Sequence, residues 1–243
     1  ALCLKSRNAV ILRGGSESLH SSLALHALIQ ASLKSHEMPE ACVCMIPTPD
    51  RAVVSAMLKA HEYIDVMIPR GGKGLTERVA LEATMPVFSH LDGICHIYVH
   101  GSAKPETATN VTRNAKMRRT GICGAMETLL LDRALPDKTS AAILGHLLDE
   151  GCVIVGDAQV QNLDPRITAA SDEDWSCEYL DAKLSCKFVE NVNDAVDHIN
   201  AYGSHHTDSI LAEDESAVAY FLNNVDSGIV MHNASTQFAD GGE

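Results

Sequence analysis

Residues 8–16 read Asn-Ala-Val-Ile-Leu-Arg-Gly-Gly-Ser, and this stretch sets the fold class of the chain. Its apolar run predicts a short β-strand, which the Arg-Gly-Gly-Ser segment ends in a turn. Apolar residues then recur at steps of three and four from Leu19 to Leu33, which predicts a helix that Pro39 ends. The stretch therefore predicts one strand–turn–helix unit of a parallel α/β fold.

The same order of strand and helix repeats over about the first ninety residues. Strands are predicted at 42–46, 64–68 and 86–89, with helices at 51–61 and 75–84 between them. The strand sequences are continuously apolar, as expected when both faces of a parallel sheet are covered. This half of the chain therefore predicts a parallel sheet with crossover helices.

A second alternating set follows, separated from the first by polar residues. Residues 90–96, His-Leu-Asp-Gly-Ile-Cys-His, come directly after the fourth predicted strand, where the sites of parallel sheets collect. Residues 157–173 predict a polar loop. Helices are predicted at 103–117, 141–148, 193–202 and 216–223, and strands at 127–131, 152–154, 184–189, 209–211 and 228–231.

Composition excludes several classes of protein. The chain has 243 residues, 46% of them hydrophobic, and a net charge of −13, which is unfavourable for binding nucleic acid or an anionic membrane. No apolar run reaches the roughly 18 residues of a membrane span, and the first residues lack the layout of a signal peptide. Eight cysteines without a CxxC pair or metal-like spacing indicate buried thiols and a reducing, cytoplasmic compartment.

Two predicted strands end in a Gly-Gly turn that opens onto a helix. The turns are Arg13-Gly14-Gly15 and Arg70-Gly71-Gly72. Such turns leave backbone N–H groups free to bind an anion. Neither matches the GxGxxG pattern, and either alone is accounted for by a tight turn, but two at matching strand ends favour a nucleotide-type ligand.

Cys123 stands out among the thiols by its position. It lies between a predicted helix and a predicted strand, and small neighbours such as Gly121 and Gly124 leave room for a substrate carbonyl. The arginines at 118–119 favour the thiolate, which is the nucleophilic form. The alternative is a buried structural thiol, which is the interpretation given to the other cysteines outside residues 90–96. The residues alone leave both open, and the histidine-containing clusters match no metal site.

Seven segments, taken in chain order, carry a family resemblance. They are Asn8–Glu17, Ile68–Gly72, Ser89–Val99, Asn114–Met117, Cys123–Leu130, Tyr202–Asp208 and Asn233–Glu243. Together they resemble the gamma-glutamyl phosphate reductase family, a proline-biosynthesis branch of the aldehyde dehydrogenase superfamily. Within them, Gly124 replaces an asparagine that is common in the family.

The resemblance implies a fold and a domain organisation. The fold is α/β, with a Rossmann-like parallel-sheet cofactor domain joined to an α/β catalytic domain of the aldehyde dehydrogenase type, truncated at both ends. Residues 1–100 would form part of the cofactor-binding domain, 101–232 the catalytic domain and 233–243 the start of a return segment. Both domains agree with the two alternating sets above.

The resemblance also implies an activity. The family reduces L-glutamyl 5-phosphate with NADPH, which gives L-glutamate 5-semialdehyde, phosphate and NADP. The nucleophile falls on Cys123, whose thiolate would attack the acyl phosphate and form a thioester. The implied protein is cytoplasmic, forms homo-oligomers and associates with glutamate 5-kinase. No metal, nucleic acid or membrane is implied.

Individual site residues follow from the same resemblance. Those near the adenosine ribose and its 2′-phosphate are Arg13, Gly14, Gly15 and Ser16. Those at the pyrophosphate are Gly71 and Gly72, and Glu178 would bind the nicotinamide ribose. His90 and Asn233 are expected at the substrate.

Two alternatives to the reductase remain. Hydrolytic aldehyde dehydrogenases carry a glutamate, in a Glu-Leu-Gly-Gly-Lys segment, that activates water. This chain has His90-Leu91-Asp92-Gly93 there, so the base is replaced by a histidine, which suits a thioester that must be kept from water. The other alternative is an inactive fragment of the reductase.

Overall fold

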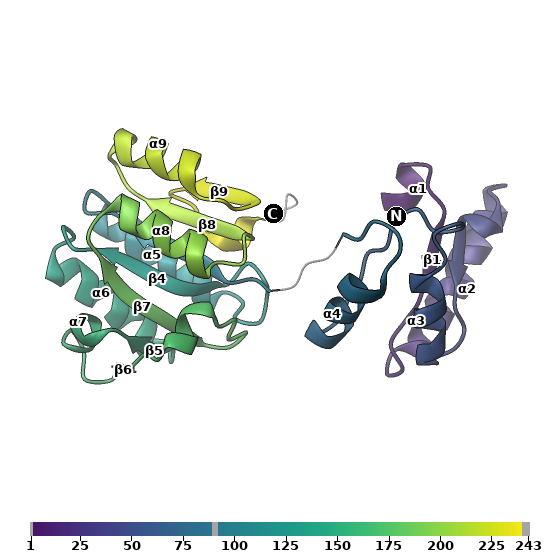
Figure 1. The fold of residues 1–243 in the computed structure, drawn as a ribbon, viewed down its shortest axis with the longest axis horizontal. Helices are drawn as coiled ribbons and strands as arrows, with labels where there is room; N and C mark the ends of the chain where they lie inside the picture. Colours follow the sequence, from purple (N-terminus) through teal and green to yellow (C-terminus); the bar gives the residue numbers. More distant parts are fainter. Residues whose placement is uncertain (1, 89–91, 240–243) are drawn as a thin grey trace. The chain divides into compact units, whose positions relative to one another are not determined.

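The computed structural model of the chain describes residues 2–88 and 92–239 (Figure 1). The chain divides into two compact units, with the boundary between Ser89 and His90. The sequence predicted a boundary after residue 100. The difference arises because residues 95–99 pair with strands of the second unit on both sides.

The first unit contains a two-stranded parallel sheet in its described part. Strand β1 (Val10–Leu12) pairs with β2 (Val43–Met45). The predicted strands at 64–68 and 86–89 are reduced to a single bridge between Met67 and Val87. The helical segments are α1 Leu2–Lys5, α2 Leu19–Ser35, η1 Glu40–Cys42, α3 Arg51–Leu58 and α4 Lys73–Glu82.

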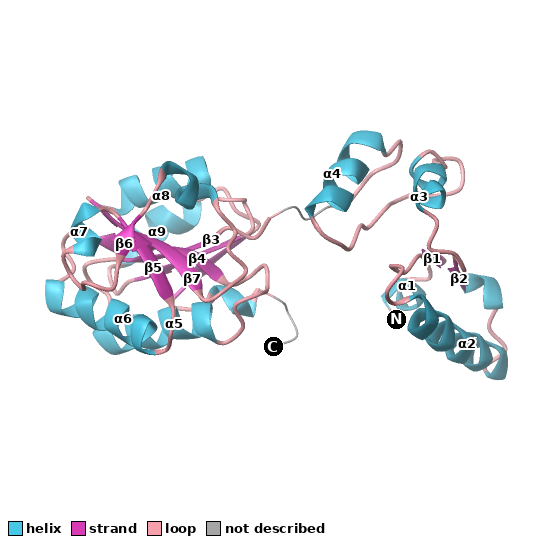
Figure 2. Ribbon diagram, turned by 90° about the horizontal axis from the view of Figure 1, so that it is seen from below, coloured by secondary structure: helices cyan, strands magenta, loops and turns pink. Residues whose placement is uncertain are grey.

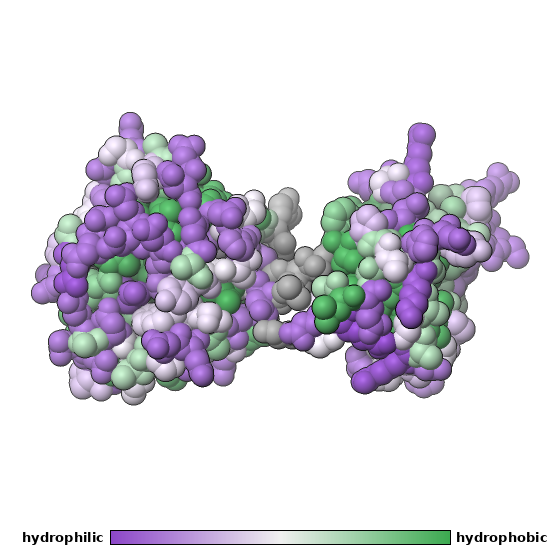
Figure 3. All heavy atoms as spheres, viewed as in Figure 1, coloured by the Kyte–Doolittle hydropathy of each residue, from purple (hydrophilic) through white to green (hydrophobic). Residues whose placement is uncertain are grey.

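The first unit leaves much of its apolar surface exposed. In β1, Ile11 is 43% exposed and Leu12 39%, so the expectation that both faces are covered does not hold for this strand. On α2, Leu25 and Leu28 are more than half exposed. Hydrophobic side chains are visible on the surface of this unit in Figure 3. Its few buried hydrophobic residues are Leu33, Val43, Leu58, Val79 and Met85.

The second unit is an α/β sandwich. Among the described residues its sheet has seven strands in the order β6-β5-β7-β4-β3-β8-β9, and all neighbouring pairs are parallel. The strands are β3 Cys95–Val99, β4 Met126–Asp132, β5 Val153–Gly156, β6 Thr168–Ala169, β7 Lys183–Val189, β8 Thr207–Leu211 and β9 Ile229–His232. The helical segments are α5 Pro105–Met117, α6 Asp137–Asp149, α7 Ala158–Gln161, η2 Asp172–Ser176, α8 Val192–Tyr202, α9 Glu215–Asn224 and η3 Thr236–Phe238.

Helices cover both faces of this sheet (Figure 2). On one face, α5 and α6 bury a cluster that includes Ile97, Leu129 and Leu144. On the other, α8 and α9 bury a cluster that includes Tyr98 and Leu130. The central strands β3 and β4 are buried along their whole length, including polar residues such as His96 and Glu127. No helix in the described part of the chain is long and apolar enough to cross a bilayer.

Strand β3 was not predicted, because His96 makes its sequence look polar. The His96 side chain is fully buried, and its Nδ1 lies 3.1 Å from Oδ1 of Asp208 on the neighbouring strand β8. The same oxygen accepts a hydrogen bond from the His96 backbone N–H at 2.7 Å. Asp208 therefore pairs with both the backbone N–H and Nδ1 of His96, whereas the buried Nε2 has no hydrogen-bond partner among the described residues. His96 belongs to the core and not to a strand-end cluster.

The buried His198 of α8 predicts acid sensitivity. Its ring packs edge-on against Trp175 and His96, and burial lowers its pKa to about 3. Below about pH 6.5 the His198 side chain binds a proton in the unfolded chain but not in the folded chain. The free energy of unfolding should therefore fall by about 1.4 kcal/mol for each pH unit as the pH is lowered from about 6 to about 4. Replacing His198 with Phe should flatten this dependence.

The measurement is denaturant unfolding followed by fluorescence of the single tryptophan, Trp175. His146→Phe, at an exposed position on α6, is the control and should keep the wild-type slope. An unchanged pH dependence in His198→Phe would contradict the assignment.

Candidate active site

The predicted nucleophile and its neighbours lie along one edge of the second sheet. Cys123 precedes β4, Gly93 precedes β3 and Glu178 precedes β7. Because these strands are adjacent and parallel, the loops entering them meet at the amino edge of the sheet. The sequence predicted a site after a strand, at a carboxyl edge, and the structure corrects this: residues 92–94 lead into β3.

Cys123 is half-buried and held through its backbone. A Cβ atom at Gly93 would lie 2.1 Å from the Cys123 carbonyl oxygen and 2.6 Å from its Cα, so only glycine fits at position 93. The buried Sγ of Cys95 donates a hydrogen bond to the same carbonyl at 3.1 Å. On the other side, a Cβ at Gly124 would lie 3.0 Å from the carbonyl oxygen of Thr236. The Cys123 loop is therefore enclosed by backbone.

Glu178, in the loop that enters β7, also contacts Gly93. Its Oε1 accepts a hydrogen bond of 2.8 Å from the backbone N–H of Gly93. The next backbone N–H, that of Ile94, donates to Ser204 Oγ at 2.8 Å. Two predicted site residues therefore lie next to Gly93. The backbone of Cys123 packs against it, and Glu178 accepts a hydrogen bond from its N–H.

Buried polar contacts fix the end of α5, from which the Cys123 loop starts. Gln237 Nε2 donates to the carbonyl oxygens of Ala115 at 2.8 Å and Arg119 at 3.1 Å. Lys116 Nζ lies 2.7 Å from Glu127 Oε2, and both side chains are fully buried. Burial raises the pKa of Glu127, and the ammonium group of Lys116 opposes that rise.

Sequence reasoning assigned no role to Lys116, Glu127 or Cys95. A signal was present for the first two, since charged residues inside apolar segments such as Met126–Leu131 indicate a paired buried charge. Nothing in the sequence marked Cys95, because its part in holding Cys123 is visible only in the structure, where its thiol contacts the Cys123 carbonyl. The predicted effect of Arg118 on the thiolate stays a prediction; its guanidinium lies 5.3 Å from the centre of the Phe238 ring.

The predicted cofactor residues of the first unit lie at helix starts. Gly14, Gly15 and Ser16 precede α2, and Gly71 and Gly72 precede α4. The N-terminus of neither helix is capped by a side chain. A Cβ at Gly72 would meet nothing within 4 Å, so the approach to the start of α4 is open.

Arg13 lies at the end of β1 with part of its guanidinium unused. Its Nη2 donates to the Pro49 carbonyl at 2.7 Å, whereas its buried Nε has no hydrogen-bond partner within the described residues. Backbone N–H groups and a guanidinium are the groups that bind phosphates, so the donors at these two helix starts fit a phosphorylated cofactor.

The two predicted substrate residues are not brought together with Cys123. His90 lies outside the described residues. Asn233 follows β9, at the opposite edge of the sheet from Cys123. Its side chain bridges the backbone of Ala212, accepting from N–H and donating to the carbonyl, each at 3.1 Å. Its role at the substrate stays a prediction.

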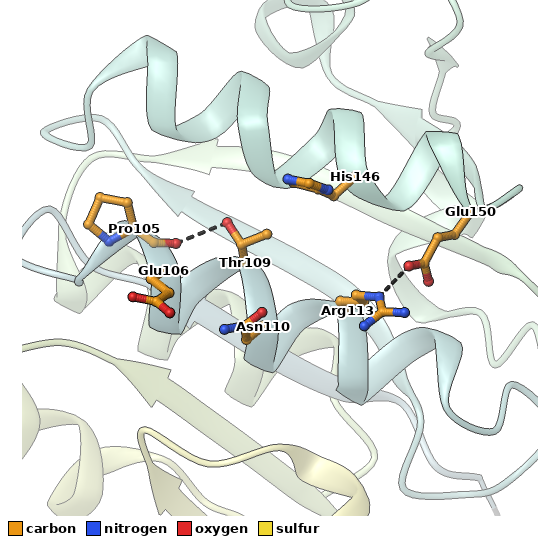
Figure 4. Close-up of a pocket in the computed structure, with 7 residues that line it drawn as sticks. All are labelled: Pro105, Glu106, Thr109, Asn110, Arg113, His146 and Glu150. Atoms are coloured by element: carbon orange, nitrogen blue, oxygen red, sulfur yellow. Dashed lines mark hydrogen bonds and ion pairs between the residues drawn. The ribbon is translucent and has the colours of Figure 1, made fainter.

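A shallow polar hollow lies apart from this edge, between α5 and α6 (Figure 4). Arg113 and Glu150 form an ion pair across it, and Thr109 Oγ1 donates to the Pro105 carbonyl at 2.9 Å. The hollow contains none of the predicted site residues. Across residues 2–88 and 92–239, no group of three or more His, Cys, Asp or Glu side chains could hold a metal ion.

Comparison with solved structures defines the class of fold. The acetylating aldehyde dehydrogenase of Geobacillus thermoglucosidasius is 19% identical, with a TM-score of 0.76 over 98% of this chain and 61% of that chain. This likeness shows an aldehyde dehydrogenase-like fold. The gamma-glutamyl phosphate reductase of Thermotoga maritima is 39% identical, with a TM-score of 0.95 over 99% of this chain and 58% of that chain.

Comparison of sequences leads to one group within that class. A relative from Paramagnetospirillum magneticum, named gamma-glutamyl phosphate reductase, is 56% identical over all 243 residues. The chain is therefore homologous along its whole length to the gamma-glutamyl phosphate reductases, as the seven segments predicted. It spans 57% of the length of that relative. No protein-family model matches the chain.

The contact between Gly93 and Cys123 predicts a sensitive position. Gly93→Ala should lower activity at least tenfold and the free energy of unfolding by about 1–3 kcal/mol, because the methyl group would overlap the backbone that holds the thiol. Gly145→Ala in α6 is the matched control, since its Cβ would meet nothing within 4 Å and helix propensity gains about 0.5–1 kcal/mol. Thermal unfolding and an activity assay check both. Wild-type activity in Gly93→Ala would refute the packing argument.

Proposed function

We propose that the protein carrying this chain reduces L-glutamyl 5-phosphate to L-glutamate 5-semialdehyde, with NADPH as reductant, release of phosphate and a role in proline biosynthesis. The observation that carries the proposal is the meeting of Cys123 and Glu178 at Gly93 on the amino edge of the second sheet. Relatives that match the whole chain are named gamma-glutamyl phosphate reductase, which supports it.

Cys123 performs the covalent step of this reaction. Its thiolate attacks the carbonyl carbon of the acyl phosphate, a C–S bond forms, and the C–O bond to phosphate breaks with the electron pair leaving on phosphate. Phosphate is a stable anion and therefore a good leaving group. The product on the enzyme is a thioester at Sγ. The backbone N–H of Cys123 is suited to stabilise the oxyanion of each tetrahedral stage.

The family resemblance indicates which residues would hold the cofactor. Arg13, with its unpartnered Nε, would bind the 2′-phosphate, and Gly14, Gly15 and Ser16 the adenosine ribose beside it. Gly71 and Gly72 would bind the pyrophosphate at the start of α4. Glu178 would accept a hydrogen bond from the nicotinamide ribose. When bound, NADPH supplies the hydride that converts the thioester carbon to the aldehyde level.

Hydrolysis is the competing fate of the thioester. In the segment 90–93 a histidine replaces the glutamate that activates water in hydrolytic aldehyde dehydrogenases, so this chain lacks that base. Rapid conversion of glutamate 5-semialdehyde to glutamate with NADP, in buffer without phosphate, would instead favour the hydrolytic alternative. An intact fold with no reaction in either direction would favour the inactive fragment.

Assembly and location remain part of the proposal. The family resemblance supports a homo-oligomer in the cytoplasm, with glutamate 5-kinase as a partner that supplies the acyl phosphate. A labile acyl phosphate makes direct transfer between two such enzymes chemically favourable.

Replacing Cys123 with Ser should abolish turnover. A serine hydroxyl is a much weaker nucleophile at neutral pH than a thiolate, so kcat should fall at least 1,000-fold while NADPH still quenches Trp175 fluorescence with an unchanged Kd. The control is Cys44→Ser, which removes an exposed thiol of the first unit and should retain full activity. Turnover by Cys123→Ser within tenfold of the wild type would show that another residue is the nucleophile.

Replacing Arg13 with Leu should change the choice of cofactor. Loss of the guanidinium should raise KM for NADPH at least tenfold and KM for NADH less than twofold, because only NADPH carries the 2′-phosphate. Lys59→Leu removes an exposed cation from the same unit and serves as the control. Equal increases for both cofactors would contradict the assignment of Arg13.

A further inference from the structure

A buried ion pair spans the two ends of the Cys123 loop. Lys116 lies in the last turn of α5, and Glu127 is the second residue of β4. Their Nζ and Oε2 atoms are 2.7 Å apart, and both side chains have 0% exposure. The loop between α5 and β4, residues 118–125, contains Cys123. The pair therefore links the end of α5 to the start of β4, the two elements that the Cys123 loop connects.

Stability alone does not explain this pair. Removing two charges from water costs several kcal/mol per ion, and well-packed hydrophobic residues in place of a buried pair are often equally or more stabilising. The residues that precede the two members of the pair in sequence, Ala115 and Met126, are fully buried and apolar. The charges of Lys116 and Glu127 must therefore contribute something other than stability.

The surroundings of Glu127 indicate what this contribution is. The backbone N–H groups of Leu180 and Tyr179 act against the rise in the pKa of Glu127, so they lie near its carboxyl group, although its buried Oε1 has no hydrogen-bond partner within the described residues. Leu180 has a φ of +53°, a strained value for a branched side chain, so the chain turns sharply where it meets this carboxylate. Glu178 immediately precedes this turn and binds the Gly93 N–H. Glu127 therefore lies near the segment that presents Glu178.

We propose that Lys116 and Glu127 are positioning residues that hold the Cys123 loop and the Glu178 segment in register at the amino edge of the sheet. Lys116 anchors the carboxylate from the α5 side, and the carboxylate in turn orients the turn after Glu178. The inference rests on the proposed function for its catalytic meaning. The reactivity of Cys123 tests it independently of turnover.

The test replaces the pair by apolar residues of similar length in the intact protein. Lys116→Met/Glu127→Met should keep the melting temperature near or above that of the wild type. Its kcat should nevertheless fall at least tenfold, KM for NADPH should rise, and the pH profile of Cys123 alkylation by iodoacetamide should shift. The single variant Glu127→Gln keeps the shape of the carboxylate and should shift the alkylation profile in the same way.

A surface pair of the same type provides the matched control. Lys104 Nζ and Glu213 Oε2 are also 2.7 Å apart but exposed, and Lys104→Met/Glu213→Met should leave the alkylation profile, kcat and KM unchanged.

The outcomes distinguish failure of this inference from failure of the proposed function. Wild-type alkylation in either Lys116→Met/Glu127→Met or Glu127→Gln would reduce the pair to a structural feature and overturn the inference. If the wild-type protein shows no NADPH-dependent reduction, the proposed function fails, while the alkylation profiles still decide whether the pair positions Cys123.

Discussion

The close approach of two backbones, at Gly93 and Cys123, is the constraint on which the candidate site depends. A side chain at position 93 would occupy the space of the Cys123 carbonyl, so the two loops pack without intervening side chains. That proximity allows the Gly93 N–H to reach Glu178 and the Cys95 thiol to reach the Cys123 carbonyl. Three strands thus contribute to one site through contacts of the main chain.

The two units differ in how completely their apolar residues are covered. In the second unit, helices on both faces enclose β3 and β4, so its loops project from a rigid sheet. In the first, two short strands leave Ile11 and Leu12 partly exposed, although both Gly-Gly turns still lead into helices. The predicted anion-binding positions therefore depend on local turn chemistry, whereas the placement of Cys123 depends on the packing of a whole sheet.

Much of this fold could be predicted from periodicity, and the exceptions have physical causes. The strand at 127–131 and the helices at 193–202 and 216–223 were found within two residues of their observed bounds because apolar spacing defines them. Strand β3 was missed because His96, which is buried and paired with Asp208 through Nδ1, looks polar in sequence. Cys123 was singled out as a candidate from its small neighbours, but its contacts with Cys95 and Gly93 join distant segments, which periodicity does not encode.

The order of strands in the second sheet has a consequence for the time at which the site forms. Strand β3 comes first in this unit, yet one of its two partners is β8, and the bond from His96 N–H to Asp208 joins residues 112 positions apart. Contacts of such high sequence separation close slowly and late. During synthesis on the ribosome, the Cys123 loop therefore emerges well before β8, the strand that completes the sheet on the other side of β3.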